Sequence, residues 1–190
     1  MSEHARSFVR HLQRLNGEPV GETVPGKGVR PRDRGAMAAL RRSLSFDPGT
    51  YPRAFPYVEP FMGSEQPYRD ARRRAYYLAA GLYALNPIQC DQPFARSLAH
   101  LAHKRIGQGG SADGVESRLM ALLGSQSENV GQYLRQLTTL LAAENGGCDY
   151  AALTDDLCIW MNPFAGSDGL DRIRQKWARQ FYQVAVSVDE

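Results

Sequence analysis

The most constraining feature of this 190-residue chain is the spacing of its apolar residues, which recur at every third or fourth position along most of its length. In the clearest stretch, Val130, Leu134, Leu137 and Leu141 follow one another at such intervals. That period places all four side chains on one face of an α-helix. No stretch shows a convincing alternation of apolar and polar residues, the pattern of a half-buried strand. The sequence therefore predicts an all-α fold.

Glycine and proline residues divide this pattern into roughly seven to nine helices. Helical spacing is found in residues 8–15, 33–44, 68–85, 93–106, 115–122, 130–141, 150–160 and 167–181. Short loops between successive helices make a helical bundle the natural architecture. Leu153, Leu157, Trp160 and Trp177 lie within apolar stripes, so we expect them in the core with the leucines of residues 134–141.

Polar residues mark the ends of two of these helices. Asp113 and Glu116 are spaced as in a capping box, which predicts a helix start at this point. Ser127 is expected to cap the helix that contains Val130, and Gly146-Gly147 is expected to end it.

Two segments lack helical spacing. Residues 17–31 are rich in glycine and proline and predict a loop or flexible arm. Residues 47–63 contain four prolines and predict a largely extended or turn-rich connection. We expect residues 1–190 to form a single helical domain, in which segment 47–63 offers a break between a small N-terminal lobe and a C-terminal bundle.

The distribution of charge says more about partners than the net charge of +3, which comes from 23 basic and 20 acidic residues. Basic residues concentrate in residues 27–42 and 69–74. On helical wheels, basic residues lie on the solvent side or the flank of several predicted helices: Arg34, Arg41, Arg42, Arg118, Arg135, Arg172, Lys176 and Arg179. Each alone is typical of a solvated surface, but together they favour a nucleic-acid partner.

Composition and terminal sequence exclude several other classes of protein. No apolar run is long enough to span a bilayer, and residues 1–14 lack the apolar core of a signal peptide. We therefore expect a cytoplasmic protein without a membrane partner. Cys90, Cys148 and Cys158 match no zinc or redox motif, so reduced thiols and no metal or other cofactor are expected.

One loose catalytic motif offers an alternative to a binding protein. Arg96 followed by His103 fits the pattern of HEPN-type ribonucleases, in which arginine stabilises charge and histidine moves protons. The sequence GQGG at residues 107–110 lacks the lysine and hydroxyl pair of a phosphate-binding loop. Asp155 and Asp156 lack the companion carboxylates of a two-metal nuclease and are interpreted as solvent-facing charge.

The order of several sequence blocks resembles the CasB family. Residues 34–42, RGAMAALRR, are similar to an early helix of that family, and a proline-containing stretch follows them. Residues 115–123, VESRLMALL, are similar to a second family block. Further similar blocks follow in the same order at residues 133–141, 149–160 and 177–182. The resemblance covers most of residues 34–182.

This resemblance implies an all-helical, non-catalytic small subunit of the type I-E CRISPR surveillance complex, Cascade. Such a subunit is present in two copies beside other subunits, a CRISPR RNA and target DNA. It helps to hold the target strand on the guide and the displaced strand of the R-loop in antiviral defence, by contacts to the backbone. The family's basic residues carry over to Arg41, Arg42, Arg118 and Arg135, and Arg34 also matches.

Lys104 and Arg105 join these candidates because of their place in the chain. The ribonuclease stays open as one alternative, and a helical scaffold that bridges protein partners without binding phosphate stays open as another.

Purified protein is expected to leave single-stranded RNA intact, with or without divalent metal, because no nucleophile, base or metal set converges in the sequence. RNA length on a denaturing gel is the measurement. Cleavage that disappears in His103→Ala would favour the ribonuclease alternative.

Overall fold

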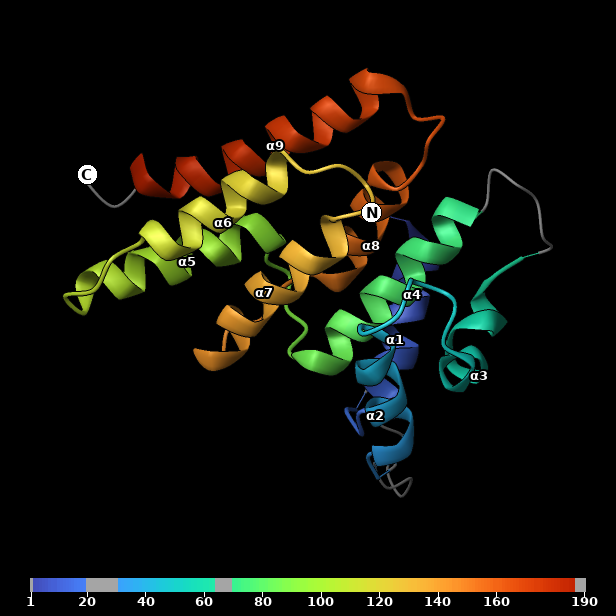
Figure 1. Ribbon diagram of the computed structural model, residues 1–190. Coiled ribbons are helices and arrows are strands. Elements are labelled where there is room, and N and C mark those ends of the chain that lie inside the picture. Colours follow the sequence, from blue (N-terminus) through green and yellow to red (C-terminus); the bar gives the residue numbers. More distant parts are fainter. Residues whose placement is uncertain (1, 20–30, 64–69, 187–190) are drawn as a thin grey trace.

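The computed structural model describes residues 2–19, 31–63 and 70–186, and these ranges contain nine α-helices and two 3₁₀ turns (Figure 1). The helices are α1 (Glu3–Leu15), α2 (Arg34–Ser43), α3 (Phe55–Val58), α4 (Asp70–Leu85), α5 (Phe94–Gly107), α6 (Asp113–Leu123), α7 (Val130–Ala143), α8 (Tyr150–Trp160) and α9 (Gly166–Val186), and the turns are η1 (Pro52–Ala54) and η2 (Glu59–Phe61). Within the described ranges the only β feature is an isolated bridge between Gln89 and Cys148. The all-α prediction is confirmed.

Helix α4 is the most enclosed element of the fold. Ala71 and every residue of 75–84 are buried. Helices α2, α3, α7 and α8 all pack against it. At Gly81 the approach of α2 is so close that an added Cβ would lie 2.6 Å from Leu44 Cδ2. The small residues of α4 therefore let neighbouring helices pack on several of its sides.

Helix α1 packs on α8, and helices α5, α6 and α9 form a second group, in which α9 runs along α5 and α6 contacts both α5 and α7 (Figure 1). Trp160 and Trp177 lie in the core with exposed fractions of 2% and 1%. Their ring centroids are 5.3 Å apart, and Phe94 lies 5.7 Å from Trp177. The predicted core leucines are buried as well: Leu134, Leu137, Leu141, Leu153 and Leu157.

The interpretation of Asp156 as solvent-facing charge is wrong. Its carboxylate is buried and accepts hydrogen bonds from Trp177 Nε1, at 2.7 Å, and from Lys176 Nζ, at 2.7 and 2.9 Å. A carboxylate is tolerated in a core when it is paired and hydrogen-bonded in this way. Lys176 is therefore engaged by α8 and does not belong to a free basic face of α9.

The prediction that residues 47–63 are extended or turn-rich is also wrong in its extended part. Pro52, Pro56 and Pro60 each lie in the first turn of a short helical element, namely η1, α3 and η2. Proline suits that position because its missing N–H has no helical partner there and its φ is already helical. These elements pack against α2 and α4. That residues 1–190 form one domain stays a prediction.

Both predicted caps are wrong in detail. Helix α6 begins at Asp113, and its N-cap, Ala112, has no side-chain oxygen to form a capping box. Helix α7 begins after Asn129 rather than Ser127, because Asn129 closes a turn onto the Gln126 carbonyl first. At the other end of α7 the left-handed residue is Asn145, with φ 54°, and the Gly146 N–H returns to the Leu141 carbonyl.

Replacing Trp177 by alanine is expected to lower the free energy of unfolding by roughly 3–5 kcal/mol, because a buried indole is lost. Trp160→Ala is expected to cost a similar amount. Denaturant unfolding followed by far-ultraviolet circular dichroism measures both. Phe164→Ala is the control, since this side chain is 74% exposed and its loss should change stability by about 0.5 kcal/mol or less. Equal midpoints for all three variants would contradict the described core.

Candidate nucleic-acid interface

Helix α2 presents three candidate arginines to solvent. The Asp33 carboxylate accepts a hydrogen bond from the Ala36 N–H and starts the helix, and the apolar face of α2 packs on α4. Arg34, Arg41 and Arg42 are left exposed. Arg41 Nε donates to the Ala84 carbonyl, at 3.0 Å, near the end of α4. Arg34 and Arg42 have no hydrogen bond or ion pair from their side chains to another described residue.

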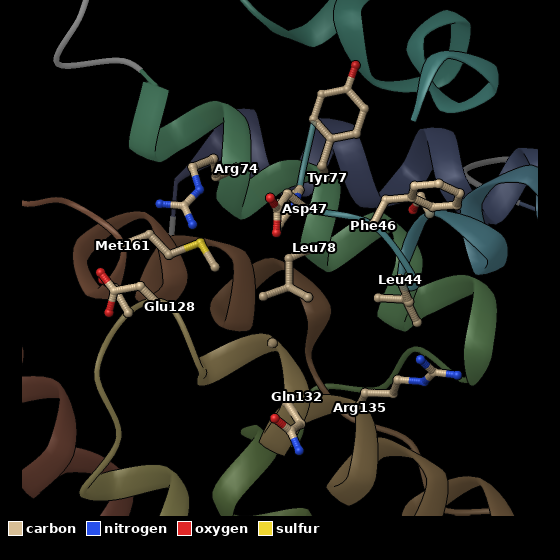
Figure 2. Close-up of a pocket in the computed structure, with 14 residues that line it drawn as sticks. Leu44, Phe46, Asp47, Arg74, Tyr77, Leu78, Glu128, Gln132, Arg135 and Met161 are labelled. Atoms are coloured by element: carbon tan, nitrogen blue, oxygen red, sulfur yellow. The ribbon is translucent and has the colours of Figure 1, made fainter. Parts of the chain in front are cut away.

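Arg135 on α7 and Arg74 on α4 line a common hollow of about 210 Å³ between α4, α7 and the end of α2. Figure 2 shows the two guanidinium groups on opposite sides of it. Neither side chain has a hydrogen bond or ion pair with another described residue. Asp47 and Glu128 also line the hollow, so its charge is mixed.

Arg74 was not among the predicted site residues, although it belongs to the arginine cluster at residues 69–74. Arg69 lies outside the described residues. The Arg72 guanidinium lies over the Tyr76 ring at 5.3 Å, and Arg73 forms an ion pair with Glu59 at 2.5 Å. Arg74 is thus the free member of the described part of the cluster. The arginine cluster is visible in the sequence, but only the packing of the fold shows which of its arginines are engaged and which is free.

Three candidates lie on α5 and α6. Lys104 forms an ion pair with Glu144, at 2.8 Å, and the lysine holds the pKa of the Glu144 carboxyl below its ordinary value. Lys104 and Arg105 are in the last turn of α5, where basic residues favourably meet the negative end of the helix dipole. Arg118 is exposed and donates to the Gly114 carbonyl of its own helix.

The seven predicted residues do not form one cluster. Arg34, Arg41 and Arg42 share α2, and Arg135 lies across the hollow from Arg74. Helices α5 and α6, with the other three, lie at the opposite end of the molecule from α2 (Figure 1). The arrangement suits contacts with a long polyanion better than the enclosure of a small ligand.

The ribonuclease pair is not assembled within one chain. Arg96 and His103 both lie on α5, separated by about 10 Å along the helix axis. Arg96 is exposed, whereas His103 Nδ1 is buried without a hydrogen-bond partner. Proton transfer needs groups within hydrogen-bond reach, so catalysis would require a second copy to complete the site.

Two of the three cysteines, Cys148 and Cys158, are held as protonated thiols by burial. All three are free rather than disulfide-bonded. Burial raises the pKa of the Cys158 thiol to about 12, and it raises the pKa of Cys148 well above the ordinary value. Protonated thiols are poor nucleophiles and poor metal ligands.

Within the described residues the structure contains neither a metal-binding cluster nor a membrane-spanning helix. Among the described residues, no group of three or more histidine, cysteine or acidic side chains is placed to hold a metal ion. Likewise, none of the described helices combines the length and apolar character that crossing a bilayer requires.

A family profile and a curated relative both match this chain, and both belong to the same family. Residues 36–182 match the sequence profile of CRISPR-associated protein Cse2. A curated Cse2 protein of Thermus thermophilus is 41% identical over 155 residues, which cover 82% of this chain and 83% of that protein.

Solved structures agree with the sequence match. The crystal structure of CasB from Thermus thermophilus has a TM-score of 0.70 at 36% identity, over 96% of this chain and 99% of that one. A chain of a CRISPR RNA-guided surveillance complex has the same fold, with a TM-score of 0.69 at 24% identity over 98% of both chains. The extent of the profile match and the identity to the Thermus protein together show that this chain belongs to the Cse2 family, also called CasB.

Proposed function

We propose that this protein is the non-catalytic small subunit of a type I-E CRISPR surveillance complex, where it binds the backbone of nucleic acid and stabilises the R-loop. Family membership supports the first part, since a chain of the same fold occurs in an RNA-guided surveillance complex. The expected partners are a CRISPR RNA, target DNA, the other subunits and a second copy of this chain.

One observation carries the nucleic-acid role. Of the seven candidate side chains, only Lys104 forms an ion pair within the described residues, and Arg105 adds an electrostatic attraction to the same Glu144 carboxylate. An exposed guanidinium without an internal counter-ion is free to meet phosphate, and its planar fork suits two hydrogen bonds to one phosphate. Arg34, Arg42 and Arg135 meet this condition without any described hydrogen bond to give up.

Backbone contact is sufficient for such a subunit. In RNA-guided recognition the guide selects the target by base pairing, so the protein needs to hold strands rather than read their sequence. Arginines spread over α2, α7 and α6 provide contacts along a strand, and the modest net charge of +3 is compatible with a subunit packed among others.

No specific observation favours the ribonuclease or the protein-bridging scaffold. The ribonuclease would need residues of a second copy, and the Cse2 family is not known to be catalytic. The protein-bridging scaffold differs from the proposal in one respect only, the absence of phosphate affinity, and binding measurements distinguish the two.

The double substitution Arg42→Ala/Arg135→Ala is expected to weaken binding to single strands and duplexes of any sequence alike. The salt dependence, log Kd against log salt concentration, should become shallower by about one unit for each phosphate that is no longer bound. Lys104→Ala should have a smaller effect, because its charge is already engaged by Glu144. Titration of labelled oligonucleotides at several salt concentrations measures these effects.

Arg6→Ala/Arg10→Ala is the matched control. It also removes two exposed arginines, but both pair with Glu3, at 3.8 and 2.5 Å. Binding and salt slope should stay close to those of the wild type. If the Arg42/Arg135 variant behaves like this control, the candidate arginines are only a solvated surface, and the scaffold alternative is favoured.

A further inference from the structure

An aromatic pair lies at the border between two hollows, each of which is lined by arginines. The Phe46 and Tyr51 rings are stacked, with centroids 4.7 Å apart and planes 20° from parallel. Phe46 lines the hollow that contains Arg74 and Arg135. Tyr51 lines a second hollow, over the outer face of α2. The pair therefore connects the two surfaces, although no row of aromatics beside the arginines is evident in the sequence.

A tight turn brings the two rings together. The Thr50 N–H returns to the Asp47 carbonyl at 3.0 Å. Pro48 occupies the second position of this turn and Gly49 the third, with φ 89°. Proline followed by a residue of positive φ is the pattern of a type II turn. The Asp-Pro-Gly-Thr sequence thus reverses the chain and places Phe46 against Tyr51.

The second hollow has a volume of about 510 Å³. Small residues of α2 form its floor: Gly35, Ala38 and Ala39. Arg42 of α2 and Arg53 of η1 line its sides, and both are exposed without a hydrogen bond or ion pair to another described residue. Its volume lies within the range of roughly 300–1,000 Å³ that is usual for sites of small ligands.

The charges favour an anion in this hollow. Among the described residues that line it, none is acidic, whereas Asp47 and Glu128 line the neighbouring hollow. Tyr51 and Tyr57 supply aromatic surface beside the two arginines. A positive, aromatic-walled concavity without internal counter-ions matches the chemistry of a nucleotide, which joins a planar base to a phosphate.

We propose that the Phe46–Tyr51 stack and the Arg42–Arg53 hollow bind an unpaired nucleotide of a single strand. The base stacks on the aromatic pair and its phosphate meets the guanidinium groups. Phe46 is 45% exposed, so part of its ring is open to a base. The inference rests on the proposed function and adds to it a contact with bases, because backbone binding alone needs no aromatic surface. Stacking tolerates any sequence, since every base has a π-face.

Phe46→Leu/Tyr51→Leu tests this inference, because it removes both π-faces while keeping apolar side chains at both positions. Its affinity for single-stranded oligonucleotides should fall about five-fold to 150-fold, the range expected when one stacked base loses its aromatic partner. Affinity for an abasic strand of the same length should not change, because the phosphates are still bound. DNA and RNA oligonucleotides are titrated separately, and a base-dependent loss on either one supports the site and identifies the strand it takes.

Two variants complete the experiment. Phe46→Trp keeps an aromatic surface and should bind like the wild type, while Phe164→Leu removes the other strongly exposed phenylalanine and should have no effect. Thermal unfolding by circular dichroism confirms that each variant is folded. Equal losses on base-bearing and abasic strands, or no loss on either, would overturn the stacking site. That result leaves the backbone proposal standing, which fails separately if Arg42→Ala/Arg135→Ala binds normally.

Discussion

The burial of α4 is the constraint on which the rest of the structure depends. A helix that is apolar on most of its surface is stable in water only when neighbours cover it on several sides. In this protein α2, α7 and α8 provide most of that cover, and the close contact at Gly81 fixes how near α2 can lie. Because α2 and α7 each bury one face against α4, the polar face of each helix is left toward solvent.

This packing decides which basic residues are free. Burial of the apolar face of α2 leaves Arg34 and Arg42 in solvent, and burial of α7 leaves Arg135 across a hollow from Arg74. Elsewhere packing neutralises charge, as where Lys176 is held by the buried Asp156 between α8 and α9. The basic surface therefore consists of the basic side chains that have no partner among the described residues of the protein. Other basic residues, such as Lys176, are already paired.

Much of this fold can be predicted from the sequence, because each helix depends on the spacing of apolar residues along a short stretch of chain. The all-α class, the helices and the buried tryptophans and leucines follow from apolar spacing, and the family follows from the order of sequence blocks. What could not be predicted depends on tertiary contacts. Asp156 is buried because Trp177 and Lys176 meet it from another helix, and the Phe46–Tyr51 stack depends on a turn between them. No periodicity distinguishes the engaged Arg72 and Arg73 from the free Arg74.

The most direct test of the account is target binding by the assembled complex. A type I-E complex is purified with this subunit, either wild type or Arg42→Ala/Arg135→Ala, and its binding to a target duplex is measured at two salt concentrations. The account predicts that the variant assembles and loads guide RNA normally, because base pairing and protein contacts govern those steps. It also predicts weaker R-loop formation with a shallower salt dependence. A variant complex that binds its target as tightly as the wild type, with the same salt dependence, would contradict the claim that these arginines hold nucleic acid.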